Sequence, residues 1–547
     1  MSKDVQDLLS RYRSLKAERR VWESHWQDLA EVFLPRRADF TTTQVAGGKR
    51  TERIFDGTPM LARRGLAAAV DGLLKPKTSR WFRLRPRDPE LEADDAVKRW
   101  VELAEERLWS ALYDPRAKFV QRTAEVDDDL VTFGTGVLYV GEGGDLDRLL
   151  FRSVPLKDAL LLEGAEGDVD SLFLRMELSA RQAAERFGRK RLGAKTLEAL
   201  EGPNAKPDRR FAFLQAVFPR RERNPRRVGA ADLPFASVVV DVESQHAVGE
   251  GGFHDFPFAI PRWDTAAGEV YGRSPAMLAL PDANSLQEMG KTLLVAGHKA
   301  TDPPLLAADD SVLGAIKTFP GGITYFDAET VRDLGRLPVT PLQSGANVPL
   351  GREMQNDTRD QIWQAFFRNV LQLPVGAPSM TATEVLERKD EFLRTIGPVF
   401  GRLEADYPAV IVERAFGLLD RAGAFPERPE RLRGRRLRFT FASPVEQARR
   451  QVEAAGAARA VELLAPFVSA QPEIMDHFDG DAIARDTPDI FGLPQRWLRP
   501  RETVEGLREG RAQARQAAAL AAALGGAPAG APAGMGGAEG PTAEAGA

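Results

Sequence analysis

The chain has 547 residues, of which 43% are hydrophobic and 28% charged, a composition typical of a folded protein with several domains. It contains no cysteine, which excludes disulfide frameworks, thiol nucleophiles and Cys-ligated metal centres. The formal net charge of −4 lacks the basic excess typical of proteins that grip DNA tightly. The N-terminus has no signal-like apolar segment and no apolar run is long enough to span a membrane, so we expect a soluble protein that works inside a cell or in a particle assembled there.

The first 270 residues predict an α+β domain, with helices followed by a mostly antiparallel sheet. Apolar side chains recur at helical spacing from Val5 to Phe33, and Pro35 follows, so we expect one amphipathic helix over this stretch. A helix, a short strand and another helix are then expected over residues 59–74, 81–84 and 94–112. From Val131 onward, β-branched and aromatic runs predict strands, with a short helix over 180–187 among them.

The centre of the chain is organised around one long helix. The sequence FPFAIPRW at 256–263 predicts a short strand before it. The helix is expected to begin after Ser274, whose hydroxyl is a suitable N-cap, with Pro275 at the first helical position. Pro281 should kink or restart this helix, and the sequence Asp302-Pro303-Pro304 should end it.

A second long helix follows closely, so the two helices predict a hairpin with a small head. Residues 303–345 contain a Gly/Pro-rich patch and short extended runs, which predict a β-rich insertion. The helix from Pro349 to Leu371 then carries one apolar face, with charged and amide side chains opposite. That apolar face consists of Met354, Thr358, Ile362, Phe366 and Val370.

A short proline-rich segment, LPVGAPSM at 373–380, separates the hairpin from a third long helix. The sequence Thr381-Ala-Thr-Glu384 has the form of a capping box at the start of that helix, which should end near Gly423. Pro398 and Pro408 lie inside the helix and should bend it twice.

The remainder of the chain predicts less structure. The sequence RLRGRRLRFTFAS returns to strand character, and residues 445–512 predict a mixed helical region. The Ala/Gly/Pro-rich tail at 513–547 has few large side chains, so we expect it to be disordered in isolation.

No combination of residues in the sequence predicts an enzyme mechanism. The five histidines show no metal-ligand spacing. Adjacent acidic residues could bind Mg²⁺, although a solvated turn or helix cap is the favoured interpretation, at Asp94-Asp95, Asp127-Asp128-Asp129 and Asp309-Asp310. The sequence Phe133-Gly134-Thr135-Gly136 fits a strand turn better than a dinucleotide site. Basic clusters at 220–227 and 431–438 favour solvated faces or salt bridges between subunits.

Long blocks of this sequence resemble the portal, or head-to-tail connecting, proteins of short-tailed DNA bacteriophages. The blocks are WESHWQDLAEVFLPRRADF, IFDGTPMLARRGLAAAVDGLL, GTGVLYVGEG, FPFAIPRW, GEVYGRSPAMLALPDANSLQEM and MTATEVLERKDEFLRTIGPVFGRLE. They occur in the family's order over roughly residues 20–440.

The resemblance implies a ring-forming subunit with the phage portal architecture. In chain order its parts would be the wing (1–270), the first stem helix (271–302), the clip (303–345), the second stem helix (346–372), the tunnel loop (373–380), the kinked wing helix with its return strand (381–444), the helical crown (445–512) and the tail (513–547).

Three groups of residues acquire roles from this resemblance. The tunnel loop would touch DNA in the channel through Leu373, Pro374, Val375, Gly376, Ala377, Pro378, Ser379 and Met380. Neighbouring stem helices would pack through Leu286, Met289, Leu293, Met354, Ile362 and Phe366. The wing would pass into the stem at Trp263, Tyr271, Gly272, Arg273, Ser274 and Pro275.

The resemblance also implies partners. A homo-oligomeric ring of about twelve copies at one capsid vertex would conduct double-stranded DNA non-specifically. It would dock the large terminase and then the tail adaptor, and it would contact major capsid and scaffolding proteins after assembly in the host cytoplasm. No cofactor and no membrane partner is expected. The alternatives are another structural virion or scaffold-type protein with helical assembly and, more remotely, a metal-dependent nuclease.

Overall fold

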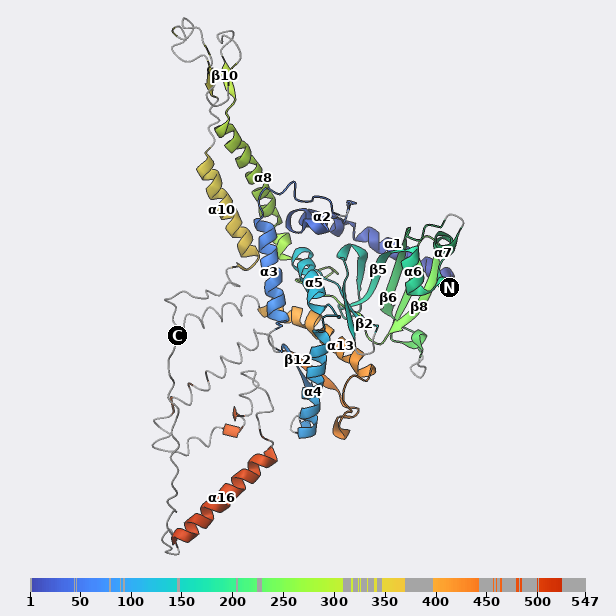
Figure 1. Cartoon of the computed structure of the whole chain (residues 1–547), viewed down its shortest axis with the longest axis vertical. Helices are drawn as coiled ribbons and strands as arrows, with labels where there is room; N and C mark the ends of the chain where they lie inside the picture. Colours follow the sequence, from blue (N-terminus) through green and yellow to red (C-terminus); the bar gives the residue numbers. More distant parts are fainter. Residues whose placement is uncertain are drawn as a thin grey trace, which may run out of the picture. The chain divides into compact units, whose positions relative to one another are not determined.

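The computed structural model describes residues 2–307, 347–368, 397–441 and 501–523, except for positions 44, 46, 78–79, 89, 92–93, 145–147, 203–204 and 224–228, and adds scattered positions between 308 and 500. Residues 1–446 and 447–547 form two compact units. In the second unit the longest described element is α16, Arg501–Ala523, a helix whose described side chains are almost all exposed. Figure 1 labels the elements used below.

The N-terminal apolar stripe forms two helices, so the prediction of a single helix was wrong. They are α1, Ser2–Glu18, and α2, Arg20–Phe33, followed by a 3₁₀ turn, Pro35–Arg37. Between them Arg19 turns inward and donates hydrogen bonds to the carbonyl oxygens of Leu156 at 3.0 Å and Lys157 at 2.8 Å. Val5 packs against the five-stranded sheet, whereas Trp26 lies in the main core. One straight helix could not reach both.

Three helices and a strand follow, and one of the helices was not predicted. They are α3, Thr58–Leu74; β1, Phe82–Pro86; α4, Asp95–Leu112; and α5, Phe119–Phe133. The strand expected from Val131 onward is wrong for its first residues, because 131–133 complete α5, which ends at Gly134. This helix is buried over most of its C-terminal half, so its apolar residues show no clear helical period.

Two antiparallel sheets complete the N-terminal region. The smaller has the order β3-β2-β9, and the larger has the order β4-β5-β6-β7-β8. The strands are β2, Leu138–Glu142; β3, Leu149–Ser153; β4, Ala159–Glu163; β5, Val169–Ser179; β6, Arg210–Pro219; β7, Phe235–Asp241; β8, His246–Phe253; and β9, Phe258–Ala259. Helices α6, Ala180–Phe187, and α7, Ala194–Glu201, lie between β5 and β6. The antiparallel sheet and the helix over 180–187 are confirmed, and the fold class is α+β.

Two long helices extend away from these sheets as a hairpin (Figure 1). They are α8, Pro275–Thr301, and α10, Val348–Ala365, and beyond them β10, Leu305–Ala307, pairs antiparallel with β11, Val339–Pro341. Of the kink or restart expected at Pro281, the restart is wrong, because α8 continues through this residue, with buried Ala279 and Ala283 on either side. The kink stays a prediction. The second helix ends at Ala365, six residues before the predicted end, and most of 308–346 lies outside the described residues.

The described part of the third long helix contains one irregular turn. Helical residues 397–404 lead into a π-helical turn, Ala405–Ala409, and then into α13, Val410–Arg421. The irregular turn contains Pro408, where the sequence predicts a bend. Gly423, with φ of +71°, follows the helix end as predicted. The return strand is β12, Leu437–Phe441, which pairs with β1, and residues 381–396 lie outside the described part of the chain.

Candidate functional site: the base of the helical hairpin

The first turn of α8 is held against the turn that follows α5. The Ser274 hydroxyl donates to the Thr132 carbonyl oxygen at 2.8 Å and also accepts from the Met277 N–H at 3.2 Å, which makes it the N-cap of α8. The Gly272 N–H donates to the Thr135 hydroxyl at 2.9 Å. These bonds connect segments about 140 positions apart in the sequence and fix where the hairpin begins.

Two glycines make this contact possible. Gly134 has φ of +80°, a conformation that residues with a Cβ rarely adopt. A Cβ on Gly134 would clash with the carbonyl group of Gly272, and a Cβ on Gly272 would clash with the carbonyl oxygen of Gly134. Gly134 therefore lets the backbone at the end of α5 approach the backbone at Gly272 closely. Residues 133–136 do not form the strand turn that the sequence suggested.

Aromatic side chains from α2 close the junction on one side. The Tyr271 ring lies 5.0 Å from that of Trp26 and 5.8 Å from that of Trp22, between ring centres. The Tyr271 hydroxyl accepts a hydrogen bond from the Leu161 N–H at 3.2 Å, and burial raises the pKa of this tyrosine. The Arg273 guanidinium lies 5.5 Å from the centre of the Trp22 ring. The residues predicted for the wing–stem junction thus come together, although their role in an assembly stays a prediction.

A loop over residues 55–57 ties the two hairpin helices together. The Gln287 side-chain oxygen on α8 accepts from the N–H groups of Phe55 at 2.7 Å and Asp56 at 3.0 Å, and its amide donates to the Asp56 carbonyl oxygen at 2.8 Å. Arg359 on α10 donates two hydrogen bonds to the Asp56 carboxylate, at 2.9 and 2.7 Å. Burial alone would raise the pKa of Asp56, but hydrogen bonds from Thr58 and Arg359 lower it below its ordinary value.

Sequence reasoning missed this clamp. Asp56 lies in a segment with the composition of a surface loop, and Arg359 lies on the charged face of its helix. Polar side chains carry no periodic signal, so only the juxtaposition of residues 56, 287 and 359 reveals their joint role.

The predicted stem-packing residues differ in how far a single chain covers them. Leu286 and Ile362 are fully buried and Phe366 is nearly so, whereas Met289 and Leu293 are half-buried. Met354 is 49% exposed. Further large apolar side chains on the hairpin are open to solvent, namely Leu278 (75%), Leu294 (52%), Val295 (47%) and Leu350 (53%). Within the described residues, the hairpin therefore carries several large apolar side chains that are open to solvent.

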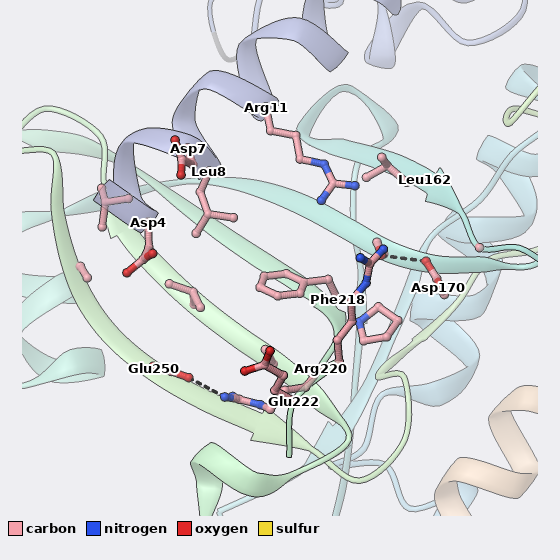
Figure 2. A pocket seen from close by; sticks show the side chains of 18 of the residues that line it. Asp4, Asp7, Leu8, Arg11, Leu162, Asp170, Phe218, Arg220, Glu222 and Glu250 are labelled. Carbon is pink, nitrogen blue, oxygen red and sulfur yellow. Dashed lines mark hydrogen bonds and ion pairs between the residues drawn. The ribbon is translucent and has the colours of Figure 1, made fainter. Parts of the chain in front are cut away.

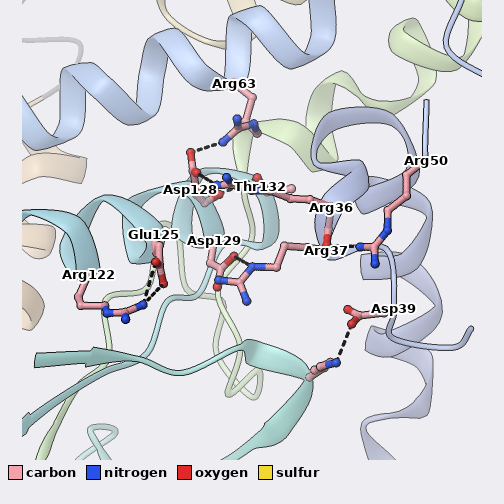
Figure 3. Close-up of polar contacts among 11 residues, drawn as sticks. Arg36, Arg37, Asp39, Arg50, Arg63, Arg122, Glu125, Asp128, Asp129 and Thr132 are labelled. Atoms are coloured by element: carbon pink, nitrogen blue, oxygen red, sulfur yellow. Dashed lines mark hydrogen bonds and ion pairs between the residues drawn. The ribbon is translucent and has the colours of Figure 1, made fainter. Parts of the chain in front are cut away.

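The three consecutive aspartates lie in the interior of α5, so the expected solvated turn or cap at this position was wrong. Figure 3 shows two of them, Asp128 and Asp129. Asp128 is paired with both Arg36 and Arg63, while Asp129 lies 3.3 Å from Arg37. Burial raises the pKa of Asp127 to about 7 and that of Asp129 to about 6. Within the described ranges, no group of three or more His, Cys, Asp or Glu side chains could hold a metal ion.

A groove of about 1000 Å³ lies between α1 and the five-stranded sheet (Figure 2). Apolar side chains such as Leu8, Leu162 and Phe218 line it, and Arg220 pairs with Glu250 at 2.9 Å on its rim. Its described lining includes no histidine, and the Ser171 hydroxyl donates to Asp170 at 2.7 Å.

Two further expectations concern the channel and the membrane. The predicted DNA-contacting loop, residues 373–380, lies outside the described residues. In the part of the chain that is described, no helix is both long enough and apolar enough to cross a membrane.

Known proteins resemble this chain along most of its length. A sequence model of the family described as bacteriophage head to tail connecting protein matches residues 5–498. The portal protein of Salmonella phage epsilon15 is 29% identical over 511 residues, which is 92% of this chain and 90% of that protein. The probable portal protein of Bordetella phage BPP-1 is 29% identical over 513 residues, again 92% of this chain and 90% of that protein. The family match extends into both compact units.

Solved structures of a gene transfer agent particle also align with the chain. A chain from the virion of the native particle aligns with a TM-score of 0.36 at 13% identity, covering 82% of this chain and 95% of that one. A chain from the neck of the native particle, determined with C12 symmetry, aligns with a TM-score of 0.33 at 12% identity, covering 80% and 94%.

Proposed function

The chain belongs to the family of bacteriophage head to tail connecting proteins, and we infer from this membership that it is a portal protein, a structural component of the virion at one capsid vertex. Copies of the chain assemble into a closed ring of about twelve subunits around a channel for the genome. Double-stranded DNA passes through this channel during packaging and ejection. The family is structural, and no catalytic step is assigned to this chain.

The main structural support for a ring is the set of exposed apolar side chains on the hairpin. Leu294 and Val295 near the end of α8, and Leu350 and Met354 on α10, are each about half exposed in the single chain. Large apolar side chains grouped on a projecting element indicate a protein–protein contact. In a closed ring the same hairpin recurs in every subunit, so each copy covers the apolar surface of its neighbour.

The parts of the chain then have distinct partners. Residues 303–345, the clip, dock the large terminase during packaging and the tail adaptor afterwards. The wing, residues 1–270, contacts the major capsid and scaffolding proteins. The tunnel loop, residues 373–380, presents small and apolar side chains to DNA, which suits a channel along which phosphates must slide without being held.

Native mass measurement together with electron microscopy of the purified full chain tests the ring. We expect particles of about twelve copies with a central hole. A stable monomer at micromolar concentration, or an open filament without a hole, would contradict the proposal.

A further inference from the structure

One broad side of the helical hairpin is marked by the loop at 55–57. Gln287 on α8 and Arg359 on α10 both hydrogen-bond to Asp56, so their side chains point toward the same side of the hairpin. Because residues three and four positions apart share one face of a helix, the rows that contain Gln287 and Arg359 lie on this side as well. We call it the loop side. Its further members are Lys291, Leu294 and His298 on α8 and Arg352 and Asn356 on α10.

The opposite broad side consists of other residues of the same two helices. Two positions along an α-helix correspond to a rotation of about 200°, so a residue midway between two members of a row points away from them. Met354 lies midway between Arg352 and Asn356, and Met289 occupies the equivalent place on α8. We call this the far side. Its members are Leu278, Asp282 and Met289 on α8 and Leu350, Met354 and Asp357 on α10.

Exposed apolar residues of the two sides lie at the same height of the hairpin. A Cβ added to Gly351 would clash with the Leu293 side chain, so α8 and α10 are in close contact at this level. Leu294 follows directly on the loop side, and Leu350 precedes Gly351 on the far side, and both leucines are about half exposed. Two hairpins placed side by side at equal height would therefore bring these leucines together.

The charged residues around these leucines differ in sign between the two sides. The loop side has Lys291 and Arg352, which are both exposed. The far side has Asp357, which is exposed, and Asp282, which is half-buried. The exposed Glu353 lies next to Met354 at the edge of the far side. One side of the hairpin is therefore basic and the other acidic, and each includes exposed apolar residues.

Two unlike sides favour one kind of contact between copies of the chain. Two loop sides in contact would place basic residues against basic residues, and two far sides would place acidic residues against acidic ones, which is costly. A loop side against a far side instead brings opposite charges together and covers apolar residues on both. A contact between two different surfaces repeats from copy to copy and closes into a ring where the rotation allows.

We propose that the loop side of one hairpin binds the far side of the hairpin of the neighbouring copy. The inference rests on the proposed ring, and it names the two surfaces that meet at each contact between subunits. Leu294 of one copy packs against Leu350 of the next copy. Lys291 and Arg352 of the first copy face Asp357 of the next, so charge fixes which side meets which.

Charge reversal on one side at a time tests this contact in the full-length protein. The loop-side variant is Lys291→Glu/Arg352→Glu, and the far-side variant is Glu353→Lys/Asp357→Lys. Native mass measurement and sedimentation velocity report the assembly state as a function of protein concentration. For each variant alone, we expect the concentration at which half of the chains are in rings to rise at least about tenfold, because like charges then meet in every contact.

Two controls separate this effect from a general change in charge or folding. The variant Lys190→Glu/Lys195→Glu makes the same change in net charge at exposed positions near α6 and α7, and it should assemble as the wild type does. Raising the salt from about 0.1 M to about 1 M shortens the Debye length from about 10 Å to about 3 Å, so assembly of both reversed variants should recover. Circular dichroism confirms that each variant is folded.

An equimolar mixture of the two reversed variants provides the positive test. Glutamates on the loop side of one variant then meet lysines on the far side of the other, so we expect rings that contain both chains at the concentration where the wild type assembles. A chain that had failed to fold could not recover in this way.

The outcomes distinguish this contact from the ring itself. If the wild type forms rings and either reversed variant alone assembles equally well, or if the mixture stays monomeric, the contact is overturned and the ring stands. If the wild type forms no ring, the proposed function fails and the contact fails with it.

Discussion

At the scale of single residues, the charge buried on α5 has the largest consequences. Both oxygens of Asp127 accept hydrogen bonds from the Lys75 ammonium at 2.9 Å, and both side chains are 1% exposed. The Lys75 nitrogen also lies 4.3 Å from the centre of the Tyr407 ring, in the π-helical turn, and 3.5 Å from Asp71. Removing two charges from water costs several kcal/mol per ion, and only close geometry offsets this. The pair therefore links α3, α5 and the irregular turn.

The pKa of Asp127 predicts how stability depends on pH. Burial raises the pKa from its ordinary value to about 7 in the folded chain, so between about pH 4 and pH 7 the native state binds a proton that the unfolded state releases. This contribution to stability is complete below about pH 4 and is lost as the pH rises through 7, with a slope of at most about 1.4 kcal/mol per pH unit. In Asp127→Asn the contribution is absent.

Thermal unfolding of the wild type and of Asp127→Asn between pH 5 and pH 8 measures this difference. We expect the midpoint of the variant, relative to the wild type, to rise across that range. Parallel pH profiles would show that Asp127 is ionised throughout and would contradict the assigned pKa.

At the scale of elements, the hairpin helices depend on contacts at their base. Ser274 caps α8, Asn347 caps α10 by accepting from the Leu350 N–H at 3.1 Å, and the loop at 55–57 bridges both helices. Gly290 lies under that loop, because a Cβ there would be 3.0 Å from the Cβ of Phe55. The loop can approach α8 only where the helix lacks a side chain.

Two alanine substitutions in α8 test this close approach. Gly290→Ala should displace the loop and destabilise the protein by roughly 1–3 kcal/mol, the usual range for overpacking. Gly297→Ala, about two turns further along, has no atom within 4 Å of the added Cβ, so it should be neutral or stabilise the helix by up to about 1 kcal/mol. Thermal unfolding and hydrogen exchange at residues 55 and 56 would distinguish them, and equal effects would contradict the close approach of the loop to Gly290.

At the scale of the whole molecule, one chain leaves its hairpin incompletely covered. Within the described residues, Leu286, Ile362 and Phe366 of the predicted stem set are buried, whereas Leu294, Val295, Leu350 and Met354 are about half exposed. In the proposed ring, the neighbouring subunit covers these four exposed side chains. In a ring with closed symmetry, every copy makes the same contacts with its neighbours. A head-to-tail contact that does not close into a ring would instead produce fibres.

The variant Leu294→Lys/Met354→Lys should therefore shift the protein from rings to monomers, because an ammonium group buried at the contact would be left without a partner. Leu197→Lys on α7, which is 36% exposed in the native chain, is the control and should assemble normally. Sedimentation velocity reports the assembly state, and circular dichroism confirms that each variant is folded. If the double variant forms normal rings, these hairpin residues are not part of the contact between subunits.

Local signals in the sequence determined several elements of this protein. Local patterns predict α3, α4 and α8, and side-chain caps at Asp94 and Ser274 start the last two of these helices. The helix α6 begins at the predicted residue, after a capping box of Ser179 with Gln182. These signals involve residues only a few positions apart, so they can be recognised in the sequence without knowledge of the fold. The family resemblance also rests on sequence alone, and the match over residues 5–498 confirms it.

Only the tertiary structure decided which distant residues meet. In the structure the first helix ends before Arg19, and α5 extends over residues where a strand was expected. The aspartates of α5 pair with four basic side chains, and β1 pairs with a strand about 355 positions away. Burial and ion pairing depend on contacts between segments far apart in the chain, and a polar residue has the same local signature whether it ends in solvent or in the core. The base of the hairpin, where Gly134 meets Gly272 and Asp56 meets Gln287 and Arg359, is therefore a property of the fold.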